Sequence, residues 1–191
     1  MVKASAPGKC ILFGEHAVVY GQPALACSIN QRMIIELERE ETFDTWRLDG
    51  RTFNPRKHPH IEYIRNQIST DNGEPLHIRI RGTIPKASGL GSSAALSVAL
   101  CGALQQLRND PLDQTLASAI SHQAEATAQG GRASPLDTAT SSFGGFVVLS
   151  DTIEEGLDFM HMVSRRLICS LATCTVYKSL PKKILNKKCR I

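Results

Sequence analysis

The alternation of apolar and polar side chains predicts strands in the first half of the chain. Short segments rich in branched or apolar residues are separated by turn signals at Pro7-Gly8, Gly21-Gln22-Pro23 and Asn30. The pattern predicts antiparallel strands over residues 2–5, 10–13, 24–29 and 33–38, with 45–48 continuing the same sheet. Residues 76–81 (LHIRIR) alternate strictly, which predicts a further strand with one buried face.

A helical period replaces the alternation in three segments. The predicted helices cover residues 60–68, 92–107 and 112–128, and a last predicted strand covers 143–150. Asp110-Pro111 ends the second helix, and Gly130-Gly131 ends the third. Strands first, then two helices and then a strand are typical of an α+β layer fold rather than of repeated βαβ units.

Composition and charge describe an ordinary globular chain. Its 191 residues are 42% hydrophobic and 21% charged, which suits one domain and at most an incomplete second one. The net charge of +4 is uneven, because no acidic residue follows Asp158 while eight basic residues do. We expect this basic end to be solvated, with no nucleic acid or membrane partner, because aromatic interleaving and nucleic-acid motifs are missing.

The six cysteines show neither a CxxC pair nor metal-binding spacing with histidine. Cys10, Cys27 and Cys101 stand among apolar neighbours and are expected to be small buried residues. The chain shows no signal peptide and no long apolar run, so a cytoplasmic location with reduced thiols is expected.

A glycine–serine loop at residues 85–95 (PKASGLGSSAA) runs directly into the helix predicted from 92. The first turn of a helix has unpaired N–H groups and partial positive charge, which favour an anion. Gly89 and Gly91 allow close approach of the backbone to a ligand, and Ser92 and Ser93 add hydroxyl groups. The same residues also suit a plain capped helix after a turn, so both interpretations stay open on local composition.

Two common phosphate loops fit this segment poorly. A P-loop requires Lys and then Ser or Thr after its last glycine, whereas Ser92 follows Gly91 here. The loose dinucleotide fingerprint is satisfied, with Asp110 and Asp113 downstream, but the preceding strand alternates instead of being continuously apolar. An anion loop that follows an antiparallel strand remains.

Two other segments carry residues suited to chemistry. In residues 5–21 (SAPGKCILFGEHAVVYG), Lys9 lies in an apolar strand, and Glu15-His16 separates two apolar runs. In residues 125–139 (EATAQGGRASPLDTA), Glu125 lies near a helix C-terminus, where the helix dipole disfavours a carboxylate unless a cation compensates. Each residue also has an ordinary structural explanation: a snorkelling lysine, a hydrogen-bonded turn histidine, or, for Asp137, a helix cap.

Together the three segments resemble the GHMP small-molecule kinase superfamily, and within it the archaeal branch that acts on mevalonate. The matching residues are APGK at 6–9 with GEHAVVYG at 14–21, Pro85 with GLGSSAA at 89–95, and ASPLD at 133–137. Galactokinase-like relatives usually continue the GEH motif with Thr-Asp instead. The resemblance implies an α+β fold, the GHMP kinase N-terminal domain (ribosomal protein S5 domain 2-like), with an antiparallel sheet packed with helices over residues 1–151.

The resemblance also implies a reaction, the ATP-dependent phosphorylation of mevalonate to 5-phosphomevalonate in isoprenoid precursor synthesis. Ser93 and Glu125 would bind Mg²⁺, Asp137 would accept the hydroxyl proton, and Lys9 would stabilise charge on the transferring phosphoryl group. Mevalonate would be bound by Lys9, Glu15, His16 and Asp137. ATP would be bound by Pro85, Lys86, Ala87, Ser88, Gly89, Leu90, Gly91, Ser92, Ser93, Ala94 and Ala95.

The chain departs from the family pattern in two places. Gly130-Gly131 adds one residue between the glutamate and the aspartate, and the resemblance fades after residue 151. We therefore expect residues 152–191 to be a divergent or truncated tail and the chain to be an incomplete enzyme. The apolar surface left uncovered favours instability or association, for example as a homodimer. The alternatives are another kinase of the superfamily, acting on a sugar or phosphomevalonate, or a non-catalytic nucleotide-binding remnant.

Overall fold

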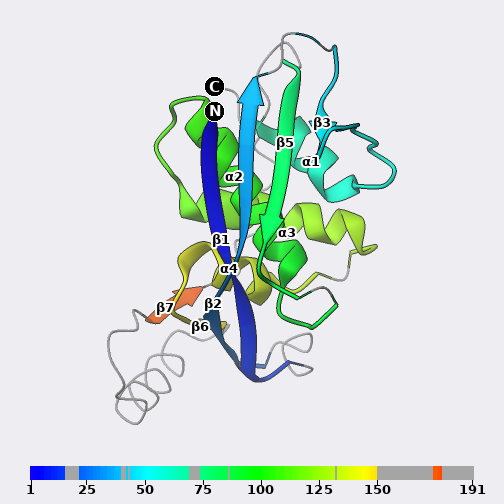
Figure 1. Ribbon diagram of the computed structural model, residues 1–191. Coiled ribbons are helices and arrows are strands. Elements are labelled where there is room, and N and C mark those ends of the chain that lie inside the picture. The colour runs from blue at the N-terminus through cyan, green and yellow to red at the C-terminus, as the bar shows by residue number, and fades with distance from the viewer. Residues whose placement is uncertain are drawn as a thin grey trace.

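The computed structural model describes residues 1–15, 22–39, 42, 44–68, 74–85, 87–131, 133–149 and 174–177 (Figure 1). The strands are β1 Val2–Phe13, β2 Ala24–Arg39, β3 Arg47–Leu48, β4 Arg51–Thr52, β5 Leu76–Gly82, β6 Phe146–Leu149 and β7 Cys174–Tyr177. The helices are α1 Pro59–Ile68, α2 Ser92–Leu107, α3 Gln114–Ala128 and α4 Pro135–Phe143. The predicted α+β class is confirmed.

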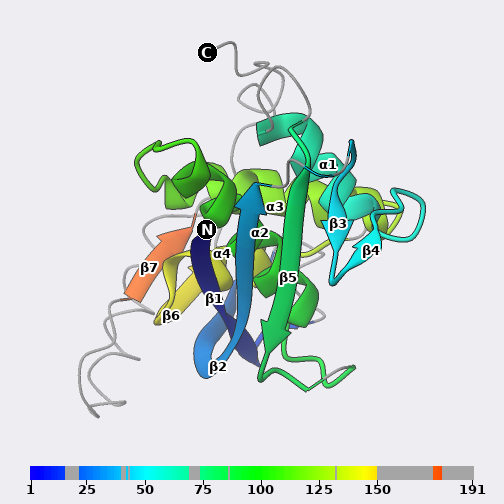
Figure 2. The same ribbon diagram turned by 45° about the horizontal axis from the view of Figure 1, so that its top comes forward.

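The long strand β2 organises the sheet. Its first part pairs with β6 and its second part with β5, while β1 pairs with it along both parts, all antiparallel. The predicted antiparallel pairing is found between these strands, but the sheet as a whole is mixed, because β3 pairs with β5 and β6 pairs with β7 in parallel. Figure 2 shows β1, β2 and β5 side by side, with β6 and β7 at one end of the sheet.

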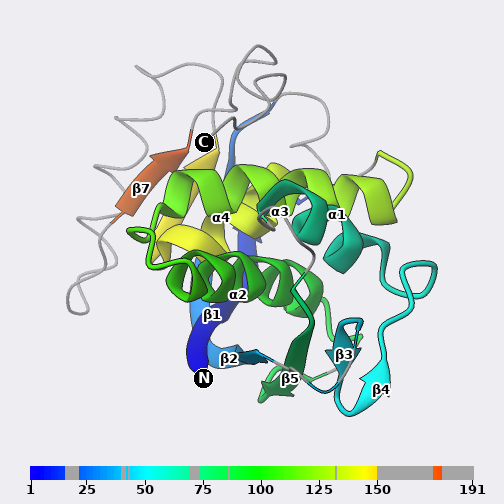
Figure 3. The ribbon, with the colours of Figure 1, turned by 90° about the horizontal axis from the view of Figure 1, so that it is seen from above.

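The helices form two layers on one face of the sheet (Figure 3). α2 and α4 contact β1 and β2, whereas α1 and α3 pack mainly on other helices. The predicted face of α1 is buried, with Ile61, Ile64 and Ile68 in the main core. A smaller core cluster joins Leu136 of α4 to β2 and β6. The layers place the N-termini of α2 and α4 near Lys9 of β1.

The predicted turns at Pro7-Gly8 and Asn30 are wrong, because β1 and β2 each run through them. The pairing register shifts between Pro7 and Lys9, so β1 takes up a bulge where a turn was predicted. At this bulge the Lys9 N–H donates to the Leu90 carbonyl at 3.0 Å. A Cβ on Gly8 would lie 2.7 Å from that same oxygen, so the glycine allows the loop to approach the strand.

The helix α4 was missed, and the strand predicted over 143–150 begins only at Phe146. Pro135 occupies the first turn, and the Ser134 hydroxyl caps the helix by accepting the Leu136 N–H at 3.3 Å. Asp137 is therefore not the capping residue. The helices predicted over 60–68 and 92–107 and the strand over 76–81 are confirmed, and the helix predicted from 112 begins at Gln114.

Of the three cysteines predicted to be buried, only Cys101 is fully buried; Cys10 and Cys27 are half-buried and lie opposite each other in the β1–β2 register. All three are free thiols. Within the described part of the chain, no helix is long and apolar enough to cross a membrane. The predicted domain boundary at 151 and the predicted tail fall outside the described residues, apart from the strand β7.

Candidate active site

An ion pair joins β1 to α4. Lys9 Nζ lies 3.2 Å from Asp137 Oδ1, although Lys9 is only 5% exposed. Asp137 stands in the first turn of α4, where the helix dipole favours its negative charge. Asp137 Oδ1 is buried and accepts no hydrogen bond from the described residues. Among the described residues, the Lys9 ammonium therefore interacts with Asp137 Oδ1 by charge attraction rather than by a well-aligned hydrogen bond.

The N-terminus of α2 is open to a ligand. Gly91 is the N-cap residue, in the left-handed conformation, and no side chain caps the helix. The first turn contains no acidic residue that would repel an anion. Unpaired N–H groups and the positive end of the helix dipole therefore face the site. Gly89 also has a positive φ of 73°, so the loop turns sharply before the helix.

Gly91 is required by a close approach as well as by its φ of 70°. A Cβ at this position would lie 2.7 Å from Cγ of Lys9. The aliphatic part of Lys9 therefore runs directly against the loop before its ammonium group reaches Asp137. The loop geometry and the position of the lysine depend on each other.

Glu125 of α3 is a buried carboxylate, 4% exposed, that faces α2. Its Oε1 accepts hydrogen bonds from Ser93 Oγ at 2.8 Å and Ser97 Oγ at 2.7 Å, and its Oε2 accepts one from Gln129 Nε2 at 3.1 Å. Among the described residues, no Lys or Arg forms an ion pair with it. These hydrogen bonds offset part of the cost of burying the carboxylate, and a nearby cation would stabilise it further.

Burial and the neighbouring charges shift three pKa values around Glu125 and Asp137. Burial raises the pKa of Asp137; the Lys9 ammonium opposes this, and the carboxylates of Glu125 and Glu15 add to it. Burial lowers the pKa of His60 and of His122, against the negative charge of Glu125. Both imidazoles are therefore biased towards the neutral form.

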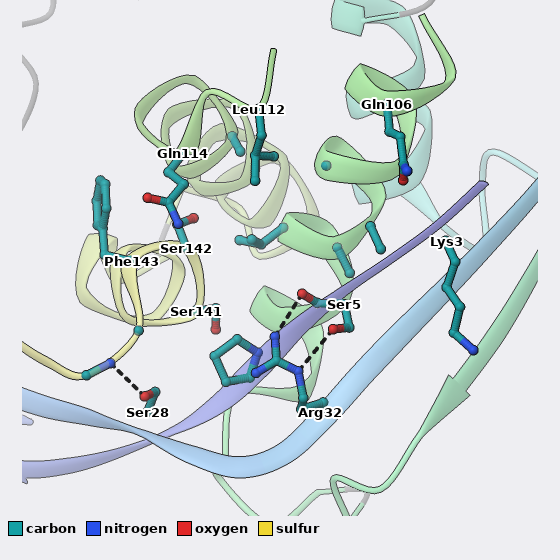
Figure 4. A pocket seen from close by; sticks show the side chains of 18 of the residues that line it. Lys3, Ser5, Ser28, Arg32, Gln106, Leu112, Gln114, Ser141, Ser142 and Phe143 are labelled. Atoms are coloured by element: carbon teal, nitrogen blue, oxygen red, sulfur yellow. Dashed lines mark hydrogen bonds between the residues drawn. The ribbon is translucent and has the colours of Figure 1, made fainter. Parts of the chain in front are cut away.

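The Lys9–Asp137 pair, the loop before α2 and Glu125 line one cavity of about 280 Å³. It is lined by Lys9, Glu15, Ala87, Ser88, Gly89, Gly91, Ser92, Ser93, Ala94, Glu125, Gln129, Ala133, Ser134 and Asp137. A larger cavity of about 1130 Å³ lies between β1, β2, α2, α3 and α4, where Arg32 donates hydrogen bonds to Ser5 (Figure 4). That cavity contains none of the residues predicted for ATP, substrate or metal, so the smaller one is the candidate site.

The structure thus brings together residues from the three segments singled out in the sequence. Lys9, Glu15, Ser93, Glu125 and Asp137 all line the candidate site. The predicted residues His16 and Lys86 lie outside the described residues. The loop residues Pro85, Leu90 and Ala95 do not line the cavity.

Sequence reasoning missed Ser97 and Gln129, the two further hydrogen-bond donors to Glu125. Each lies four residues from a predicted metal ligand, Ser97 after Ser93 and Gln129 after Glu125, which is the spacing of neighbours on one helix face. That spacing is the signal that would have identified them.

Comparison with known proteins identifies the family. Residues 59–145 match the family described as "GHMP kinases N terminal domain". The chain is also 43% identical, over 150 residues, to mevalonate kinase of Methanothermobacter thermautotrophicus, covering 76% of this chain and 49% of that protein. The chain belongs to the GHMP kinases.

Further relatives and a solved structure agree with this family. This chain is 34% identical, over 185 residues, to mevalonate kinase of Thermococcus gammatolerans. The alignment covers 84% of this chain and 55% of that protein. The crystal structure of Methanococcus jannaschii mevalonate kinase superimposes with a TM-score of 0.68 at 26% identity, covering 78% of this chain and 53% of the other. The chain spans about half the length of the curated relatives that it matches.

Proposed function

We propose that this chain carries the site at which ATP phosphorylates mevalonate to 5-phosphomevalonate. One arrangement carries the proposal: the Lys9–Asp137 pair and the uncapped N-terminus of α2 line the same cavity. A helix N-terminus suits phosphate, and a lysine–carboxylate pair suits an acceptor hydroxyl. Mevalonate is proposed as the substrate because the relatives include mevalonate kinases.

The places of the described residues support a proposed role for each of them. The loop 85–95 and the first N–H groups of α2 hold the ATP phosphates. Asp137 accepts the proton of the attacking hydroxyl, and its raised pKa makes it a stronger base than an ordinary aspartate. Lys9 stabilises the developing alkoxide and the charge of the transferring phosphoryl group. Glu15, on the cavity wall, and His16 orient mevalonate.

Mg²⁺ suits the oxygen groups that α2 and α3 contribute to the cavity. The described residues contain no cluster of three or more His, Cys, Asp or Glu side chains able to hold a metal. Mg²⁺, however, is usually held by one or two protein oxygens together with substrate phosphates and water. Ser93 and Glu125 would hold it here, and no described Lys or Arg forms an ion pair with Glu125. When bound, the ion would neutralise phosphate charge during transfer.

The test is a phosphotransfer assay on the purified 191-residue chain with mevalonate and Mg²⁺-ATP. Mevalonate-dependent formation of ADP that is lost in Asp137→Asn is the expected result. Galactose and phosphomevalonate serve as competing acceptors, and preference for either would reject mevalonate as the substrate. Tight ATP binding without turnover on any acceptor would instead indicate a nucleotide-binding remnant. The predicted cytoplasmic location and homodimer also remain proposals.

A further inference from the structure

A line of polar side chains joins α2 to α3. On α2 these residues recur every four positions: Ser93, Ser97, Cys101 and Gln105. Ser93 and Ser97 donate to Glu125, Cys101 Sγ lies 3.4 Å from Ser121 Oγ, and the Gln105 amide exchanges two hydrogen bonds with the backbone of Asp113. Because the spacing of four keeps the residues on one helix face, the line sets how far α3 is shifted along α2.

Ser97 occupies a particular place in this line. It is 0% exposed, so its hydroxyl cannot reach a ligand in the cavity. Its 2.7 Å hydrogen bond goes to the same Glu125 oxygen that Ser93 contacts from the cavity side. Ser93 is exposed, and its hydroxyl donates a hydrogen bond to Glu125, so the lone pairs of its oxygen remain available for a cation.

The two oxygens of the Glu125 carboxylate differ in how many hydrogen bonds they accept. Oε1 accepts two hydrogen bonds, while Oε2 accepts only the one from Gln129 among the described residues. Oε2 therefore keeps more capacity for a cation than Oε1 does. The buried Ser97 hydroxyl contacts Oε1 from the side away from the cavity.

We propose that Ser97 is a positioning residue, which fixes the Glu125 carboxylate in the orientation that binds the divalent cation of the nucleotide complex. This inference rests on the proposed function, because it takes Glu125 as a ligand of that cation. Partners behind metal ligands typically change metal affinity by about 10- to 100-fold when they are removed. We expect the lower end of that range, because Ser93 and Gln129 still contact Glu125 in a Ser97→Ala variant.

The test compares ATP binding with Mn²⁺ and with EDTA, using the full chain and calorimetry or fluorescence. The ratio of the two affinities reports how well the cation site works. In Ser97→Ala this ratio should fall about 10-fold while binding in EDTA stays unchanged. Ser118→Ala is the matched control, because Ser118 is also 0% exposed but its hydroxyl has no described hydrogen-bond partner. Thermal unfolding of each variant verifies that it is folded.

The outcomes separate this inference from the proposed function. If Mn²⁺ strengthens ATP binding equally in the wild type and in Ser97→Ala, only the role of Ser97 is rejected. If Ser97→Ala weakens binding equally in Mn²⁺ and in EDTA, the serine is structural and the inference is also rejected. If the wild-type chain binds ATP no better with Mn²⁺ than with EDTA, the metal site itself is rejected, and the role of Ser97 is rejected with it.

Discussion

Lys9 Nζ and Asp137 Oδ1 lie 3.2 Å apart, although one residue belongs to the first strand and the other to the last described helix. The lysine side chain is 6% exposed and the aspartate side chain 30% exposed. The pair therefore lies at the wall of the cavity, with its carboxylate partly open to a ligand. This relationship makes the candidate site dependent on the complete packing of β1 against α4.

A double-mutant cycle measures this pair without requiring catalysis. Lys9→Met, Asp137→Asn and the double variant should give a favourable coupling of about 0.5–3 kcal/mol in the free energy of unfolding. Partial exposure of Asp137 to solvent favours the lower half of that range. Urea unfolding provides the measurement. The exposed pair Glu38–Arg79 is the comparison, and its coupling should be smaller. If the Lys9–Asp137 coupling is no larger than the Glu38–Arg79 coupling, the Lys9 and Asp137 charges do not interact as described.

The pH dependence of stability follows from the raised pKa of Asp137. A carboxylate with a raised pKa keeps its proton longer in the folded state, so the folded chain binds more protons than the unfolded one. The stability of the wild type should therefore fall, relative to Asp137→Asn, as the pH rises above 3.8, the ordinary value for aspartate, and through the raised folded value. Urea unfolding of both proteins at a series of pH values across this range measures the difference in the free energy of unfolding. An opposite slope would mean that attraction by Lys9 outweighs burial.

Replacing Gly91 by Ala should disturb the site through two separate effects. A residue other than glycine at a φ of 70° costs about 1–2 kcal/mol. The new Cβ would also press on the Lys9 side chain, and overpacking of this kind typically costs about 1–3 kcal/mol. Gly50→Ala is the matched control, because Gly50 has a φ of 79° but a Cβ there would contact nothing within 4 Å.

Gly91→Ala should therefore be less stable than Gly50→Ala in urea unfolding, and it should also bind ATP more weakly. Equal loss of stability in the two variants would show that Lys9 moves aside at no cost. Unchanged ATP affinity in Gly91→Ala would count against the loop as the phosphate site.

Cys101 should be chemically inert in the folded chain. Its thiol is fully buried, and burial raises its pKa to about 12, so almost no reactive thiolate exists at pH 8. Iodoacetamide labelling followed by peptide mass mapping should modify Cys101 only after unfolding. Cys10 and Cys27, which are half-buried, should react first. Labelling of Cys101 in the native chain as fast as Cys10 would indicate that α2 and α3 separate readily.

The periodic segments were predictable because their pattern is local. The Ile residues of α1, the strict alternation of β5 and the Ala-Leu run of α2 each identify an element from neighbouring residues. The helix α4 was not predicted because its sequence, PLDTATSSF, has too few large apolar residues to show a helical period. Its small polar residues are buried by packing on the sheet and on α2 and α3, which no local pattern shows.

In the two long strands β1 and β2, turns were predicted where the structure has continuous strands. Pro7-Gly8 is an ordinary turn signal, yet β1 continues through it as a bulge, because the loop before α2 pairs with its backbone. A contact with a residue far along the chain overrode the local preference.

The amino-acid sequence by itself determined which segments are periodic, which loop suits an anion, and which charged residues accompany it. Motifs at these positions also indicated the family. Only the tertiary structure decided that Lys9 meets Asp137, that Gly91 must remain small beside that lysine, and that Ser97 holds Glu125. Hydrogen bonds and ion pairs require atoms about 3 Å apart. Side chains on different helices and strands reach such distances only through the packing of the whole domain.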